Sequence, residues 1–136
     1  MTIEEARMVL PGVQALFGFQ LIAVFNAKFA TLTDRERVLH LSATAMIALA
    51  IILIMAPAAF HRIGQRGWVS RKLIDIASDL LTCGMMALML GLSVEFGLVA
   101  RLCLQDQTLG IVLGATLFCV ALLFWLILPL RHRRRR

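Results

Sequence analysis

Three carboxylates lie within one long apolar stretch, and a charged group inside a membrane is a candidate for proton or cation handling. Asp75, Asp79 and Glu95 all fall between residues 73 and 100, which is otherwise long and apolar enough to cross a lipid bilayer. Placing one charge at the centre of a membrane helix costs about 2.5–3.5 kcal/mol on insertion scales. These acids are therefore the candidate ion-handling residues of the sequence.

The depth of each acid follows from the helical rise of about 1.5 Å per residue. Counted from the midpoint of the stretch, Asp79 lies about 11 Å away, Glu95 about 13 Å and Asp75 about 17 Å. Asp75 and Asp79 share one face of the predicted helix, whereas Glu95 lies about 160° from Asp79 around the axis. The sequence thus predicts acids at both margins of the span, with no single relay joining them unless Gly84 or Gly91 bends the helix.

The two aspartates have two interpretations. In the first, Asp79 binds a proton or a cation, with Asp75 beside it. In the second, both pair with His61, Arg62 or Arg66 at the end of the preceding apolar stretch and lock the cytoplasmic helix ends together. Histidine titrates near neutral pH, so a pair of His61 with an aspartate could also sense cytoplasmic pH. Interfacial anchoring is the commoner use of such a histidine.

Other polar side chains inside the apolar stretches are few. Gln14 and Gln20 lie about 4–5 Å from the centre of the first stretch and about 120° apart, so we expect them to meet different neighbours. Interhelical hydrogen bonding accounts for a buried glutamine, and a role in permeation is the alternative. His40, near the outer end of the second stretch, is expected to anchor that helix at the interface.

The sequence contains no recognisable motif for binding a metal or a cofactor or for enzymatic catalysis. Four sulfur-containing side chains occur within just over two helical turns, but they do not share one face, so we expect no metal site; they are Cys83, Met85, Met86 and Met89. No nucleophile with a base and no phosphate-binding loop is recognisable. We expect neither a cofactor nor an enzymatic activity.

Four apolar segments must position these residues. The chain has 136 residues, a 60% apolar composition and a mean hydropathy of +0.86, well above the values of soluble domains. Spans are predicted at about 8–27, 38–60, 73–100 and 109–130. The expected fold is all-α, a single domain over residues 1–136 with four transmembrane helices in an antiparallel bundle.

Helix boundaries agree with these spans. Thr33 with Glu36 predicts a capping box at the start of the second helix. Ser70 can cap the third helix, and Asp106 or Thr108 the fourth.

Orientation follows from the basic residues of the short flanks. The N-terminus, the middle loop and the C-terminal tail hold ten of the fourteen: Arg7, Arg62, Arg66, Arg71, Lys72, Arg131, Arg133, Arg134, Arg135 and Arg136. The other two connections hold four: Lys28, Arg35, Arg37 and Arg101. Both termini are therefore expected on the cytoplasmic side.

The basic tail, residues 131–136, carries five of the charges behind the net charge of +6. It would attract anionic lipid by about 1 kcal/mol per charge near the surface, and it argues against nucleic-acid binding because the rest of the chain is nearly neutral. Gly110 and Gly114 form a GxxxG pattern that permits close helix approach or dimerisation. We expect a homo-oligomer, because four spans in one chain cannot contain an inverted repeat.

Two stretches are similar to a family of small bacterial membrane proteins with four helices, some of whose members carry a sodium/proton antiporter label. They are Gly12-Val13-Gln14-Ala15-Leu16-Phe17-Gly18-Phe19-Gln20 and Ala56-Pro57-Ala58-Ala59-Phe60-His61-Arg62-Ile63. The resemblance implies a bacterial inner-membrane protein and raises the hypothesis of ion transport.

Two functions follow as hypotheses. The first is a small proton or cation transport protein, acting as an oligomer, in which Asp75, Asp79 and Glu95 handle charge with His61 and Arg62 as partners. The second is a non-transporting accessory or structural membrane protein that binds partner helices or anionic lipid.

Overall fold

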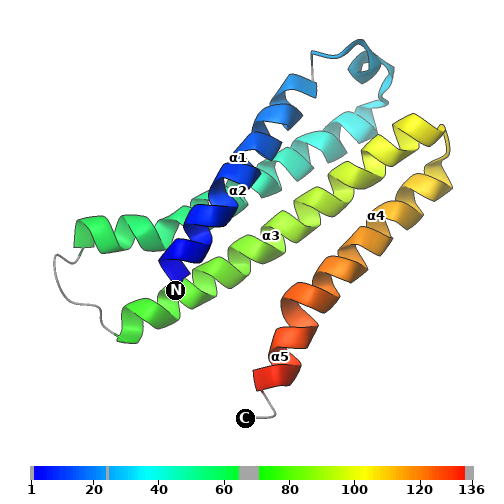
Figure 1. Cartoon of the computed structure of the whole chain (residues 1–136). Helices are drawn as coiled ribbons and strands as arrows, with labels where there is room; N and C mark the ends of the chain where they lie inside the picture. Colours follow the sequence, from blue (N-terminus) through cyan, green and yellow to red (C-terminus); the bar gives the residue numbers. More distant parts are fainter. Residues whose placement is uncertain (1, 24, 65–70, 134–136) are drawn as a thin grey trace.

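The computed structural model of the chain describes helices and their connections. It covers residues 2–23, 25–64 and 71–133, with the backbone alone at 2–9, 28, 61–64, 71–73, 132 and 133. Within these ranges all regular structure is helical and no strand is present. Four long helical segments make up most of the described chain (Figure 1).

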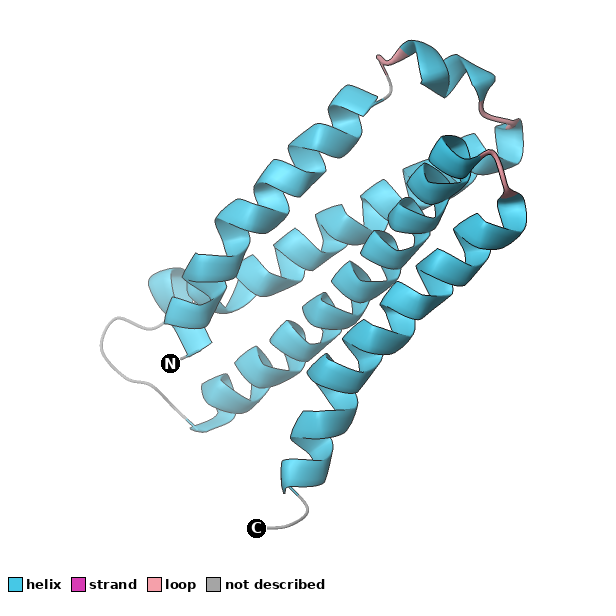
Figure 2. Cartoon of the chain, turned by 45° about the vertical axis from the view of Figure 1, so that its right-hand side comes forward, coloured by secondary structure: helices cyan, strands magenta, loops and turns pink. Residues whose placement is uncertain are grey.

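The segments are α1 (Thr2–Ala23), η1 (Ala27–Thr31), α2 (Asp34–Gly64), α3 (Arg71–Leu104), α4 (Gln107–Leu122), η2 (Leu123–Ile127) and α5 (Leu128–Arg133). The last three follow one another without a break and form the fourth long segment, as Figure 2 shows. The prediction of an all-helical chain with four long helices is confirmed.

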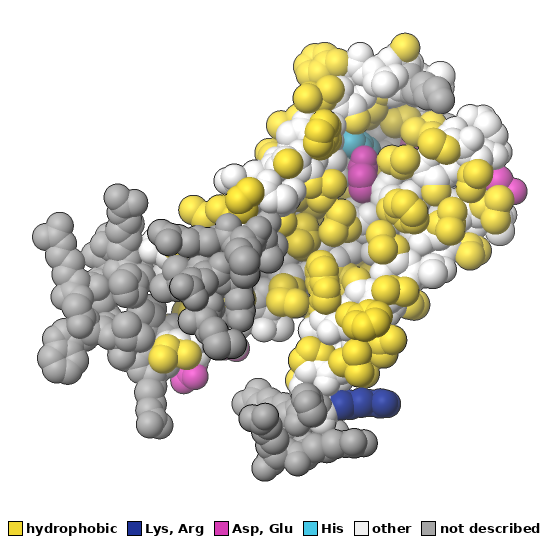
Figure 3. All heavy atoms as spheres, viewed as in Figure 1, with side chains coloured by type: hydrophobic (Ala, Val, Ile, Leu, Met, Phe, Trp, Pro, Cys, Tyr) yellow, Lys and Arg dark blue, Asp and Glu magenta, His cyan; other side chains and the backbone are white. Residues whose placement is uncertain are grey.

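Three segments are long and apolar enough to cross a membrane, namely Asp34–Phe60, Ile74–Leu104 and Gln107–Arg131. The apolar part of α1, Leu10–Ala23, is shorter than these. Many large hydrophobic side chains face outward, and hydrophobic atoms cover much of the face in Figure 3. A soluble monomer rarely exposes so much contiguous apolar surface, so the chain has the composition of a membrane protein.

The helices pack mainly on α3, which contacts α2 on one side and α4 on another, while α1 packs on α2. A small core joins Val13 of α1 with Ile47 and Ala50 of α2 and with Ala87 and Leu88 of α3. Three of the four long helices therefore meet in an apolar core.

Helix starts follow local side-chain chemistry. The predicted capping box is confirmed: the Thr33 backbone N–H donates to Glu36 Oε2 over 2.8 Å, and the Glu36 N–H donates to Thr33 Oγ1 over 3.4 Å. Asp106 caps α4 by accepting from the N–H groups of Thr108 and Leu109. Gln105, with φ of 57°, makes the tight turn before this cap.

Two helix shapes differ from the predicted spans. The first helix ends at Ala23, four residues before the predicted end, because i to i+3 hydrogen bonds such as Asn26 N–H to Ala23 C=O turn the chain into η1. The fourth segment contains a π-helical turn, η2, which ends two residues before Pro129. Proline has no N–H to complete the α-helical ladder, and the wider turn accommodates it.

Candidate functional site

Close packing of α3 on α2 sets the register of the candidate site. A Cβ atom added to Gly91 would lie 2.8 Å from Ile47 Cγ1 and 2.9 Å from the Ala43 carbonyl oxygen, so only glycine permits this contact. One helical turn from that contact toward η1 lie His40, three residues before Ala43, and Glu95, four residues after Gly91. The two side chains are thereby brought to the same level.

His40 and Glu95 form a hydrogen-bonded pair of ionisable side chains at that level. The imidazole Nδ1 lies 2.9 Å from Oε1 and 3.0 Å from Oε2 of the carboxylate. Only 8% of the His40 side chain and 15% of the Glu95 side chain are exposed. At about 1.5 Å per residue, His40 and Glu95 lie about 9–11 Å from the midpoints of Asp34–Phe60 and Ile74–Leu104, which is less than the half-thickness of a hydrocarbon layer, about 15 Å. The pair is therefore an ionisable site within two segments that are long and apolar enough to cross a membrane.

The pair borders a small cavity between η1, α2 and α3. The cavity holds about 190 Å³ and is also lined by Asn26, Phe29 and Cys103. The Phe29 ring meets the imidazole edge to face at a centroid distance of 5.4 Å and holds its plane. In Figure 3 a histidine and an acidic side chain are visible together within the hydrophobic surface. The cavity beside the pair thus lies at the end of the bundle that carries η1.

Other buried polar groups occur near this level. Thr44 and Ser93 donate their hydroxyl hydrogens to carbonyls of their own helices, at His40 and Met89. Gln20 is 4% exposed, and neither its amide nitrogen nor its amide oxygen has a hydrogen-bond partner in the described part of the chain. The expected interhelical hydrogen bond of Gln20 is therefore not present there.

Gln20 falls on the same side of α1 as the core. It follows Val13 by seven residues, which is two helical turns, and His40 precedes Ile47 by the same interval. Because Val13 and Ile47 share the core, Gln20 and His40 lie at similar heights. Gln14 is exposed, so the two glutamines lie in different surroundings.

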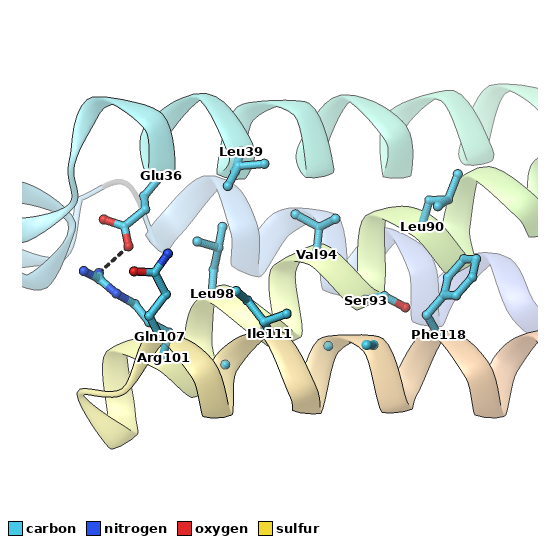
Figure 4. A pocket seen from close by; sticks show the side chains of 14 residues that line it. Glu36, Leu39, Leu90, Ser93, Val94, Leu98, Arg101, Gln107, Ile111 and Phe118 are labelled. Atoms are coloured by element: carbon cyan, nitrogen blue, oxygen red, sulfur yellow. Dashed lines mark ion pairs between the residues drawn. The ribbon is translucent and has the colours of Figure 1, made fainter.

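A second charged pair lies one turn further toward the connections. Arg101 of α3 pairs with Glu36 of α2, Nη1 to Oε1, at 2.5 Å. The pair ends an apolar groove between α2, α3 and α4 with a volume of about 480 Å³ (Figure 4). Glu36 therefore serves both the capping box and the α2–α3 contact.

The remaining predicted site residues are not brought together by the described structure. Asp75 and Asp79 are exposed on α3, and neither has an ion pair with any described side chain. The side chains of His61 and Arg62 lie outside the described part of the structure, as do those of the basic tail beyond Arg131. The proposed pairing of the aspartates with them thus stays a prediction.

The partner of Glu95 is the functional residue that the sequence reasoning missed. His40 was expected to be an interfacial anchor, but it is buried against the carboxylate. A signal was present, because His40 and Glu95 both lie about 13 Å from the centres of their predicted spans, on the same side. Equal depth on consecutive spans could have suggested the pair.

Gly110 and Gly114 lie at the contact of α4 with α3. A Cβ atom on Gly114 would lie 2.8 Å from the Ser93 carbonyl oxygen, and one on Gly110 would lie 2.6 Å from Arg101 Cβ. The GxxxG pattern is used within the chain for close helix approach.

Among the described residues, no group of three or more His, Cys, Asp or Glu side chains could hold a metal ion.

A family model described as a family of unknown function (DUF6328) matches residues 2–129. No curated protein and no solved structure matches the chain.

Proposed function

This chain belongs to a family of unknown function whose model spans residues 2–129, and on that premise we propose that it is a small proton-handling membrane protein. The observation that carries the proposal is the His40–Glu95 pair, buried within two apolar segments long enough to cross a membrane. Ionisable groups at such depth are costly and mark proton or ion pathways. The pair replaces Asp75 and Asp79 as the centre of the proposed site.

The proposed arrangement is an antiparallel bundle of four transmembrane helices in a bacterial inner membrane, with both termini cytoplasmic. The excess of basic residues at the termini and in the middle loop supports this orientation. The His40–Glu95 pair then opens through its cavity toward the outer side. Below it, Ile47, Ala50 and Leu88 form an apolar barrier toward the cytoplasm.

The charge of the pair defines what it can exchange. An imidazolium beside a carboxylate is neutral as a unit, whereas loss of one proton leaves a net negative charge in a medium that penalises it. A monovalent cation that replaces the departing proton restores neutrality. This charge balance supports exchange of a proton for a monovalent cation over free proton conduction.

Gln20 supports a polar route beside the pair. Its amide offers both a donor and an acceptor that no described group satisfies, at a height similar to that of His40. Buried amides of this kind usually bond to ordered water. Movement across the apolar barrier requires a change in helix packing, which we propose takes place in a homo-oligomer.

The test is a flux assay in phospholipid vesicles that enclose a pH-sensitive dye. With an imposed sodium gradient, vesicles containing the protein should change their internal pH, and Glu95→Gln should reduce the rate at least tenfold. Asp79→Asn is the matched control, since it removes an exposed carboxylate from the same helix and should leave the rate unchanged. Equal rates in protein-containing and empty vesicles would overturn the proposal.

A non-transporting accessory role is the second candidate, and the fourth segment favours it. Only 6% of its most apolar 18-residue stretch is buried, against 33% in α2 and 39% in α3. Lipid or partner helices must cover this surface. If Glu95→Gln lowers thermal stability while the intact protein gives no flux, the accessory role is the better description.

A further inference from the structure

We propose that the groove between α2, α3 and α4 binds one acyl chain of a membrane phospholipid whose anionic headgroup lies at Arg101. This inference goes beyond proton handling and depends only on the chain's lying in a membrane.

The groove has the size of a ligand site. Its volume of about 480 Å³ falls within the range of about 300–1,000 Å³ that is usual for small-molecule sites. Leu39 of α2 and Ile111 of α4 face it from opposite sides, and Leu98 and Val94 rise from α3 between them (Figure 4). Apart from its charged end, the lining is almost wholly apolar.

Close approach of α4 to α3 creates this hollow. Gly97 faces Gly110 and Gly114, so the two helices meet backbone to backbone over this stretch. The groove runs beside this contact, between α4 and α2, and α2 also packs on α3. The groove is therefore an open channel along the bundle surface.

The two ends of the groove differ in polarity. Arg101, Glu36 and Gln107 gather at the end near the helix connections, whereas Leu90 and Phe118 close the other end (Figure 4). Eleven residues separate Leu90 from Arg101 on α3, which corresponds to about 16 Å. One leaflet of the hydrocarbon layer is about 15 Å thick, so the groove extends from the headgroup region to the bilayer midplane.

Arg101 retains donors for a headgroup. The Arg101 side chain is 31% exposed, and its guanidinium makes one ion pair among the described residues, with Glu36 Oε1, although it carries five N–H groups. The second oxygen of Glu36 already accepts from the backbone N–H and the hydroxyl of Thr33. Free guanidinium N–H groups bind phosphate oxygens strongly and often in pairs, and Gln107 adds an amide donor beside them.

A helix from a second copy fits this groove less well. A helix is about 10–12 Å wide with its side chains and would run along the whole of α4, whereas the groove stops midway at Phe118. An acyl chain is narrow, apolar and as long as one leaflet, and its headgroup matches the one charged end.

The test is native mass spectrometry of the full chain released from vesicles of phosphatidylcholine with one-tenth phosphatidylglycerol. We expect one retained phospholipid per chain, enriched in phosphatidylglycerol. Ala115→Trp fills the groove and should reduce the retained lipid at least tenfold. Val120→Trp places the same side chain on an exposed position of α4 outside the groove and should leave it unchanged.

Arg101→Gln and Glu36→Gln both remove the ion pair, but only Arg101→Gln removes the guanidinium that is proposed to bind the headgroup. The two variants therefore distinguish headgroup binding from loss of the ion pair. The first should abolish the enrichment in phosphatidylglycerol, and the second should increase it, because Arg101 then has no competing carboxylate. Equal lipid retention by the two Trp variants, or the same direction of change in the two Gln variants, would overturn the proposal. A retained second chain in place of lipid, lost only in Ala115→Trp, would assign the groove to a copy of the protein and would also overturn it.

Discussion

The imidazole Nδ1 of His40 lies between both carboxylate oxygens of Glu95, at 2.9 and 3.0 Å, although the two residues are 55 positions apart in the chain. One imidazole nitrogen is thus within hydrogen-bond distance of both oxygens of the carboxylate. Among the described residues, each side chain is the only ionisable partner of the other. Because both side chains are buried, removal of either one leaves the other unpaired among apolar side chains.

Glu95→Ala should therefore destabilise the protein strongly. Breaking one half of a buried ion pair costs roughly 3–5 kcal/mol, whereas replacing both halves by apolar residues is often neutral. We expect the double variant His40→Leu/Glu95→Leu to be more stable than Glu95→Ala. Denaturant unfolding in detergent, followed by circular dichroism, measures both. If the double variant were the less stable of the two, the pair would not be the unit described here.

Gly114→Val should loosen the contact of α4 with α3. Even the first added carbon would lie 2.8 Å from a backbone oxygen that cannot move aside cheaply, so a loss of roughly 1–3 kcal/mol is expected. Gly18→Ala is the control, because nothing lies within 4 Å of its added carbon. That change should be neutral or stabilising by up to about 1 kcal/mol. Similar unfolding midpoints for the two variants would contradict the packing described.

Asp106→Ala should weaken the start of α4 by about 1 kcal/mol, because it removes the acceptor for two backbone N–H groups. Asp106→Asn keeps a capping oxygen and should lie within a few tenths of a kcal/mol of the parent. Thermal unfolding compares the three proteins. An equal loss in both variants would assign the effect to charge and not to capping.

Orientation in the membrane can be measured with single cysteines. In a variant with Cys83, Cys103 and Cys119 changed to Ser, Thr108→Cys should react with a membrane-impermeant maleimide added outside intact cells. Arg136→Cys should react only after the cells are permeabilised, because the basic flanks stay on the cytoplasmic side. The reverse pattern would place the proposed site on the cytoplasmic side.

The local features of the fold could be read from the sequence because they depend on neighbouring residues. The capping box of Thr33 and Glu36 and the cap at Asp106 involve side chains within three positions of the groups they bind. Apolar runs of about 20 residues likewise predict long helices without knowledge of their partners. The end of α1 was placed four residues too late, because a short 3₁₀ turn has no distinct apolar pattern.

The sequence by itself thus determined that the chain is helical, where its apolar segments lie, and that Glu95 is a charge within one of them. It did not determine the partner of Glu95, and it favoured the aspartates at the other end of the same helix. Tertiary structure decided this, because the rotation and height of α3 against α2 depend on the contact of Gly91 with Ala43 and Ile47. His40 on α2 and Glu95 on α3 lie one helical turn from that contact, on the faces that the two helices present to each other. This relationship arises only when the two helices pack.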